Sequence, residues 1–217
     1  MKKYELTDET IEVYGTALHR IKALKDFGNV KKGELGGYVE SERNLSQEGN
    51  CWVCGNAKVC GDAELCGNAK VCGNAKVCGN AKVCGDAELC GNAWVFGNAE
   101  VYGDAKVCGN AWVFGNAEVY GNAKVYGNAW VYGNAEVCGN AEVYGDADYI
   151  TIKGLGSKYR NTTIFRTKEN IAVKCGCFYG TLAEFVDKVK ETHGNSKFTK
   201  EYLALIDLVK IHFELEE

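Results

Sequence analysis

A six-residue repeat dominates the chain. Glycine occupies every sixth position from Gly49 to Gly145, and each one opens the phrase Gly-(Asn/Asp)-Ala-x-(Val/Leu)-(Cys/Tyr/Phe), almost without deviation and without insertions. A short fixed period predicts a stacked β-solenoid, because each unit buries its apolar side only against its neighbours. Such regularity leaves little room for a catalytic loop within the repeats.

The hexad itself predicts how each unit folds. Alanine and valine or leucine stand two positions apart, as in Ala57 and Val59, and residues two apart on a strand face the same side. A small and a branched apolar residue therefore point inward together. The Gly-Asn or Gly-Asp pair then turns the corner, since both residues tolerate positive φ.

Three hexads make one coil, so residues 18 apart should stack at roughly 4.8 Å. This sorting predicts an acidic face, a mixed face over a column of cysteines, and a face that carries an aromatic ladder. The ladder consists of Trp94, Phe96, Trp112, Phe114, Trp130 and Tyr132. Contiguous apolar patches of this kind mark interaction surfaces. We therefore expect the ladder to pack against another subunit or against the C-terminal helices, with a stacking platform for a planar ligand as the alternative.

The hexad Val-x-Gly-Asn-Ala-x resembles that of the left-handed parallel β-helix, whose best-known owners are sugar and amino-acid acyltransferases. The resemblance covers about residues 37–150. Three further segments are similar to hexapeptide-repeat proteins of bacteria and phages that are labelled putative transferases: Asp26-Phe-Gly-Asn-Val30, Gly33-Glu-Leu-Gly-Gly-Tyr-Val-Glu-Ser-Glu42 and Cys175-Gly-Cys-Phe-Tyr-Gly-Thr-Leu182. The resemblance implies the fold and a phage or mobile-element origin, and it supplies no catalytic residues.

The expected fold is thus mainly β, in three parts. Residues 1–48 form an N-terminal β cap, residues 49–150 the left-handed β-helix of about six coils, and residues 151–217 a C-terminal ββαα module. In this module 162–167 and 171–175 form a hairpin. Thr181 and Glu184 form a capping box that opens a helix ending at His193-Gly194, and a second helix follows.

Composition limits the function classes. The formal net charge of −4 argues against general nucleic-acid or membrane-surface binding. The N-terminus lacks the apolar core of a signal peptide and no stretch is long enough to span a membrane, which predicts a cytoplasmic protein. We therefore expect the 12 cysteines to be thiols. Nine of them share the sixth hexad position with tyrosine and phenylalanine, as expected of a packing position.

One segment after the repeats could carry chemistry. Gly156, Ser157, Lys158 and Arg160 combine flexible backbone, a hydroxyl and two cations, with Arg166 and Lys168 close behind in the sequence. This combination suits a phosphate or carboxylate. The alternative is an ordinary glycine linker with solvated charges.

We predict no metal and no cofactor. Asp86 and Asp104 should be neighbours, but two carboxylates alone make a poor cation site. The stacked cysteines lack the spacing of zinc sites, and Cys175-Gly-Cys177 is a weak signal.

The fold is typical of acyl-CoA-dependent acetyltransferases, but the residues of this chain argue against that activity. The three histidines, His19, His193 and His212, all lie outside the repeats, so a general base near a groove of the β-helix is missing. The sequence therefore favours a non-enzymatic binding protein, a homotrimer that holds or sequesters a small anionic, nucleotide-like ligand. The alternatives are the acetyltransferase and a purely structural or protein-interaction scaffold.

Overall fold

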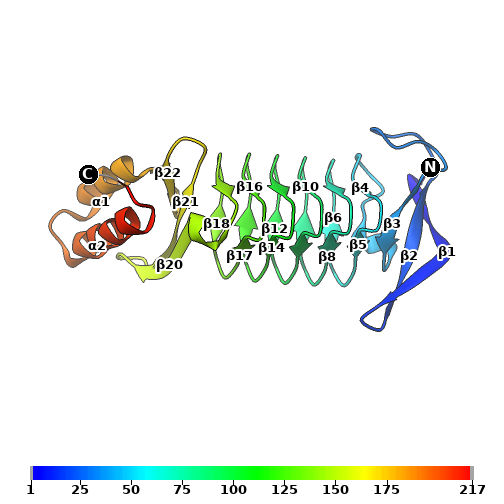
Figure 1. The fold of residues 1–217 in the computed structure, drawn as a ribbon, viewed down its shortest axis with the longest axis horizontal. Helices are drawn as coiled ribbons and strands as arrows, with labels where there is room; N and C mark the ends of the chain where they lie inside the picture. The colour runs from blue at the N-terminus through cyan, green and yellow to red at the C-terminus, as the bar shows by residue number, and fades with distance from the viewer. Residues whose placement is uncertain (1, 216–217) are drawn as a thin grey trace.

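The computed structural model describes residues 2–215 as three parts in line (Figure 1): an N-terminal cap, a prism of short strands, and a C-terminal unit of sheet and helices. No helix among these residues is long and apolar enough to cross a membrane.

The N-terminal cap is an antiparallel sheet that continues into the prism. It contains β1 (Tyr4–Val13), β2 (Thr16–Ala23) and β3 (Leu35–Val39). Strand β3 pairs in parallel with the first strand of one prism face, β5 (Lys58–Val59). The short 3-10 helix η1 (Glu42–Asn44) follows, and the Asn44 amide donates to the carbonyls of Gly61 and Ala63 at 2.9 Å each. The first coil is thereby protected from unpaired edges.

The prism has three faces, each a parallel sheet of two-residue strands. The aromatic face contains β5, β8 (Lys76–Val77), β11 (Trp94–Val95), β14 (Trp112–Val113) and β17 (Trp130–Val131). The acidic face contains β6 (Glu64–Leu65), β9 (Lys82–Val83), β12 (Glu100–Val101), β15 (Glu118–Val119) and β18 (Glu136–Val137). The mixed face contains β4 (Trp52–Val53), β7 (Lys70–Val71), β10 (Glu88–Leu89), β13 (Lys106–Val107), β16 (Lys124–Val125) and β19 (Glu142–Val143).

The register confirms the predicted 18-residue coil. Trp94 pairs with Trp112, which pairs with Trp130, and the other faces repeat the same spacing. The hexad alanines from Ala57 to Ala141 are fully buried, and so are the valines and leucines of the prism strands, at most 1% exposed. The parallel β-solenoid predicted from the hexad is therefore confirmed. Its left-handed sense stays an expectation of the resemblance.

The corners combine left-handed glycines with ladders of asparagine. Gly91, for example, has φ +68° and lies so close to Gly109 of the next coil that a Cβ would be 2.8 Å from the Gly109 oxygen. Beside it the Asn74 amide donates to Asn92, and Asn92 donates to Asn110, at 3.2 and 3.0 Å. Glycine is needed here both for its φ and for the close approach.

The cysteines correct one expectation. Instead of free thiols throughout, the structure has three disulfides between adjacent coils: Cys54–Cys72, Cys66–Cys84 and Cys90–Cys108. The coil brings each pair of Cα atoms to 4.6–4.8 Å, within the range that a disulfide spans. The 18-residue spacing makes such a pair possible but does not select it, since Cys60 and Cys78 have the same spacing and are free thiols.

The C-terminal unit is a four-stranded antiparallel sheet covered by two helices. Its strands are β20 (Tyr149–Leu155), β21 (Arg160–Arg166), β22 (Ile171–Cys175) and β23 (Phe178–Thr181), and its helices are α1 (Leu182–His193) and α2 (Lys197–His212). The 3-10 helix η2 (Asp146–Asp148) leads into it. A strand at 149–152 and a hairpin were expected from the sequence; the structure pairs that strand, β20, with the hairpin and adds β23 on its other side. The predicted capping box is confirmed, with Glu184 N donating to Thr181 Oγ1 at 3.3 Å and Thr181 N donating to Glu184 Oε2 at 2.8 Å.

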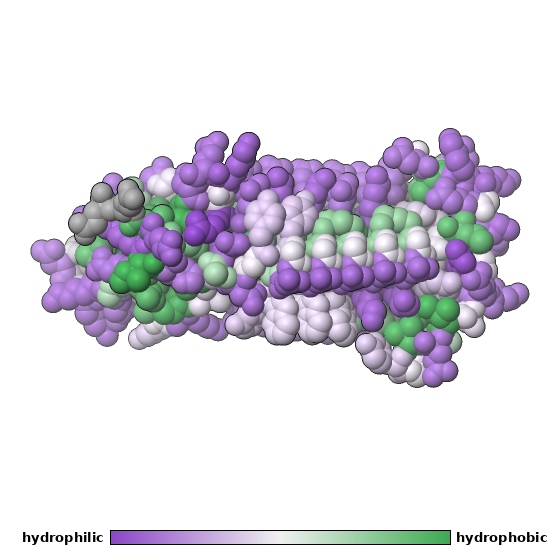
Figure 2. All heavy atoms as spheres, in the orientation of Figure 1, coloured by the Kyte–Doolittle hydropathy of each residue, from purple (hydrophilic) through white to green (hydrophobic). Residues whose placement is uncertain are grey.

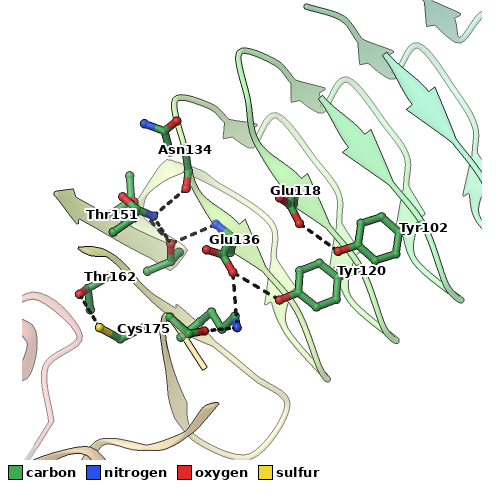
Figure 3. A network of polar contacts seen from close by, with 12 residues as sticks. Tyr102, Glu118, Tyr120, Asn134, Glu136, Thr151, Thr162 and Cys175 are labelled. Carbon is green, nitrogen blue, oxygen red and sulfur yellow. Dashed lines mark hydrogen bonds and ion pairs between the residues drawn. The ribbon is translucent and has the colours of Figure 1, made fainter. Parts of the chain in front are cut away.

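Strand β21 joins this unit to the prism. Phe165 faces the prism and joins its core, whereas Ile164 faces the helices and joins theirs. At the junction, Glu136 N donates to Thr163 Oγ1 at 3.1 Å, and the Lys174 ammonium lies 3.5 Å from the Glu136 carboxylate (Figure 3). Alternate residues of β21 thus pack into the prism core and into the core beneath the helices, which fixes the C-terminal unit to the last coil.

The aromatic ladder is only partly covered in the single chain: Trp130 and Tyr132 are exposed, and its other four residues are half-buried. Figure 2 shows pale, weakly polar residues gathered along the lower edge of the prism, where Figure 1 places β14 and β17. The rings stack on one another, with centroids 4.9 Å apart for Phe96–Phe114 and 5.1 Å apart for Trp112–Trp130. Helices α1 and α2 pack on the C-terminal sheet, in a core that contains no ladder residue. They therefore do not cover the ladder.

Candidate active site

A cavity of about 520 Å³ lies in the C-terminal unit, between the sheet and α1. Its apolar lining comes from Cys175, Phe178, Phe185, Val189 and Tyr202. Its polar lining comes from Ser157, Lys158, Arg160, Cys177, Lys188, Thr192 and His193. Most apolar members are buried, whereas the three cations are exposed, so an apolar interior opens through a basic rim.

The β20–β21 turn supplies part of this rim. Gly156 has φ +70°, and a Cβ there would lie 2.4 Å from the Tyr202 hydroxyl. Glycine therefore allows the turn to close onto α2. The Gly156 N–H donates to Glu201 Oε2 at 3.1 Å, so a carboxylate of the protein already occupies the backbone donor that we predicted for a bound anion.

The second basic group is held over a neighbouring turn. Arg160 begins β21, and a Cβ on Gly176 would lie 2.4 Å from its Nη1 atom. Gly176 has φ +57° and connects β22 to β23. The guanidinium thus lies across the β22–β23 turn, at the mouth of the cavity.

The structure brings only part of the predicted anion site together. Ser157, Lys158 and Arg160 share the cavity, and Gly156 lies buried below them. Arg166 is at the other end of β21, roughly 20 Å away at about 3.3 Å per residue. There its guanidinium is 3.2 Å from the Asp148 carboxylate and stacks on Phe213.

Lys168 also lies elsewhere. It lines a second cavity of about 520 Å³ that the C-terminal sheet forms with Lys124 and Glu142 of the mixed face. The two cavities lie on opposite sides of β23, because Phe178 lines the first and the adjacent Tyr179 lines the second. Arg166 and Lys168 therefore do not join the cluster at Lys158.

His193 lies in the first cavity, which the sequence analysis did not predict. It ends α1 as predicted, with Gly194 N donating to Lys190 O at 2.9 Å. However, its half-buried ring also lies in the first cavity, nearly parallel to Tyr202 at a centroid distance of 6.0 Å. The signal available in the sequence was that His193 follows Val189 by four residues, on the apolar side of the helix.

The other two histidines lie away from this cavity. His19 Nδ1 is 3.0 Å from the carbonyl of Thr7 in the N-terminal cap, and His212 Nε2 is 2.9 Å from the carbonyl of Ala147. Each ring is therefore tied to backbone.

The floor of the cavity is uncharged. Burial raises the pKa of Tyr202 to about 12, and its hydrogen bond with the Cys175 thiol acts in the same direction. Thr162 Oγ1 donates to Cys175 Sγ at 3.2 Å. An interior of neutral side chains below a basic rim suits a ligand with an apolar arm and an anionic end.

Fold and repeat together define the class: this is a hexapeptide-repeat parallel β-solenoid protein. The repeat family described as "YdcK Beta solenoid repeat" matches residues 117–133. The chain is also similar to the "Uncharacterized acetyltransferase YdcK" of Escherichia coli (strain K12), with 39% identity over 61 residues. That match covers 24% of this chain and 19% of the relative, so it spans about a fifth of the relative's length.

These similarities correct our functional prediction. We favoured a non-enzymatic protein that holds a nucleotide-like ligand, and a relative named as an acetyltransferase points to the alternative. The argument against that alternative was the missing base near a groove of the β-helix. That argument considered only the repeats, whereas the structure has a histidine, His193, in a cavity of the C-terminal unit.

Proposed function

We propose that the protein is an acyltransferase that uses an acyl-CoA thioester as donor and the first cavity as its active site. The observation that carries the proposal is that one cavity combines an apolar interior, three cations at its mouth and His193. Its volume of about 520 Å³ lies within the usual range for small-molecule sites.

The cavity matches the donor in two respects. The phosphates of coenzyme A would meet Lys158, Arg160 and Lys188, since cations and a hydroxyl form charge-assisted hydrogen bonds with phosphate oxygens. The pantetheine arm and the acyl group would lie against the apolar wall that Phe178 and Phe185 form together, with their ring centroids 5.2 Å apart. The predicted anion site is thereby retained at Ser157, Lys158 and Arg160, as the phosphate end of a substrate.

His193 would act as the general base. In acyl transfer the acceptor gives its proton to the imidazole and attacks the thioester carbonyl. The carbon–sulfur bond breaks, and the proton passes to the leaving thiolate. A positioned base of this kind contributes typically 10²–10⁴-fold to the rate. The reaction class is also that named for the Escherichia coli relative.

The test is acyl transfer from isotope-labelled acetyl-CoA to a panel of amines and alcohols. Free coenzyme A is followed by chromatography, because the six free cysteines of the chain would consume a thiol-specific dye. We expect turnover, and we expect His193→Gln to reduce it by a factor of roughly 10² or more. His19→Gln, at the opposite end of the molecule, is the matched control and should retain full activity.

Binding gives a second readout. Lys158→Ala together with Arg160→Ala should weaken acetyl-CoA binding about tenfold or more, since hydrogen bonds to charged groups are worth about 1.5–3 kcal/mol each. Lys153→Ala, on the same sheet but outside the cavity, should leave it unchanged. No turnover with any acceptor, combined with acetyl-CoA affinity unaffected by the double variant, would refute the proposal.

A further inference from the structure

The column of sixth-position residues on the aromatic face begins with two cysteines. Cys60 and Cys78 follow strands β5 and β8, whose residues Lys58 and Lys76 pair in register. The two cysteines are therefore one coil apart, the same relation that joins all three disulfide pairs of the prism. Yet both are free thiols, and both are half-buried.

The Cys78 sulfur accepts a hydrogen bond from the indole N–H of Trp94 at 3.3 Å. The Cys60 thiol lies one coil away and favours the ionised form of Cys78. Trp94 stands on the next coil and is the first ring of the aromatic ladder. Because a thiolate is a far better acceptor than a thiol, this arrangement favours negative charge on Cys78.

The charged groups around the two thiols affect them differently. The Lys76 ammonium lies 5.3 Å from the centre of the Trp94 ring and acts on both thiols, favouring their ionised forms. The Glu40 carboxylate acts on Cys60 in the opposite direction. The pKa of Cys78 is lowered to about 6, mainly by the neighbouring Cys60 thiol, whereas the pKa of Cys60 is raised. The Trp94 N–H donates to Cys78 and not to Cys60, so Cys78 is the sulfur that this geometry favours as the thiolate.

We propose that Cys78 is a modification site for low-molecular-weight disulfides, with Cys60 as the resolving thiol that converts the adduct into a fourth disulfide between coils. The Cys78 thiolate attacks one sulfur of oxidised glutathione and releases one glutathione thiolate. Cys60 then loses its proton, attacks the Cys78 sulfur and releases the second glutathione. The two cysteines are oxidised, and one oxidised glutathione is reduced to two thiols.

The other free cysteines lack this arrangement. None of them has a second free cysteine one coil away; they are Cys51, Cys138, Cys175 and Cys177. For Cys138 the pKa is raised by burial. The proposal is independent of acyl transfer, since it concerns the opposite half of the molecule and none of the cavity residues.

The experiment follows Cys78 in the folded full-length protein by mass spectrometry of tryptic peptides. Residues 71–76 and 77–82 both read Val-Cys-Gly-Asn-Ala-Lys, so Cys72 and Cys78 would give identical peptides. Lys82→Arg at an exposed position changes the mass of the second peptide alone and serves as the background for every variant.

Oxidised glutathione should yield a Cys60–Cys78 disulfide in this background. In Cys60→Ser, which keeps a hydroxyl donor, the reaction should stop at one glutathione on Cys78. A Cys60→Ser protein that carries no glutathione on Cys78, or a background protein without the Cys60–Cys78 disulfide, would overturn the proposal.

The pH dependence of Cys78 alkylation by iodoacetamide tests the thiolate. We expect a midpoint near pH 6. The midpoint is a better measure than the rate at one pH, because nucleophilicity falls as thiol pKa falls. Trp94→Phe keeps the ring and removes the N–H, and should raise the midpoint by about one pH unit. A wild-type midpoint at the ordinary thiol value of about 8.5 would contradict the inference.

Discussion

Glu201 of α2 accepts a hydrogen bond from the backbone N–H of Gly156, at 3.1 Å, and so places a carboxylate beside the basic rim of the cavity. If anionic substrates bind at Lys158 and Arg160, this carboxylate opposes them. Glu201→Gln keeps an acceptor for the Gly156 N–H and removes the charge. We expect acetyl-CoA to bind two- to fivefold more tightly, on the order of 0.5–1 kcal/mol, when measured by calorimetry at low ionic strength.

The control for this change is Glu12→Gln in the N-terminal cap, which alters the net charge equally at a remote site. It should leave the affinity unchanged. The gain in Glu201→Gln should also shrink at high salt, because exposed charges are screened. Weaker binding in Glu201→Gln would mean that the carboxylate supports the turn more than it repels the ligand.

Alanine substitution at three corner glycines distinguishes the energetic cost of a positive φ from the cost of steric crowding. Gly145 lies outside the left-handed region and has open space around its Cβ position. Gly133 has φ +71° with the same open space, whereas Gly91 has φ +68° and a Cβ position 2.8 Å from the Gly109 oxygen. Substitution by alanine should be nearly neutral at Gly145 and cost about 1–2 kcal/mol at Gly133. Gly91→Ala should cost more than Gly133→Ala.

Denaturant unfolding of the three variants gives this order directly. If Gly91→Ala and Gly133→Ala lost the same free energy of unfolding, the coils would be able to move apart at the corner without an energetic cost. A loss at Gly145 comparable with that at Gly133 would contradict the role assigned to positive φ.

The sequence predicted the solenoid because its physical cause is local and repeated. Ala57 and Val59 already indicate an inward-facing pair, and the period of 18 residues then places Trp94 beside Trp112 without knowledge of any long-range contact. The helix boundaries at Thr181 and His193 were predictable for the same reason, since capping depends on neighbouring residues.

The candidate site was predictable only in part because it depends on contacts between distant elements. Lys158, Arg160 and Arg166 look like one cluster in the sequence, but β21 is a strand and separates its two ends. Strand β23 is four residues long and begins directly after Gly176 and Cys177, so it has no recognisable pattern. His193 looks like an ordinary helix end until α2 brings Tyr202 against it.

Buried Tyr202 predicts a loss of stability at alkaline pH. Its pKa is raised to about 12, chiefly by burial, so the folded protein keeps its proton where the unfolded chain has lost it. This contribution is complete below about pH 10 and declines as pH rises through about 12. Tyr202→Phe cannot ionise, and its unfolding midpoint should fall less steeply with pH across this window.

Thermal unfolding of both proteins between pH 9 and about 12 checks this expectation. Tyr159→Phe, whose side chain is exposed, should give the wild-type slope. Parallel curves for wild type and Tyr202→Phe would place the alkaline loss in other tyrosines, such as Tyr4 and Tyr149, whose pKa values burial also raises.

The aromatic ladder predicts self-association. Phe96 stacks on Phe114 within 1° of parallel and Trp112 on Trp130 within 6°, so these rings present their edges outward. Trp94 meets Trp112 edge to face at 73°, so the ladder offers no continuous platform to a planar ligand. Trp130 and Tyr132 remain 44% and 49% exposed in the single chain. A second copy of the chain would bury them, and a homotrimer is the assembly we expect. Trp112→Glu would place a carboxylate in that contact and should yield monomers in analytical ultracentrifugation.

Tyr126→Glu is the matched control, because it makes the same change of an aromatic residue on the mixed face and should leave the assembly intact. A wild-type protein that sediments as a monomer at all concentrations would rule out the ladder as an interface between copies.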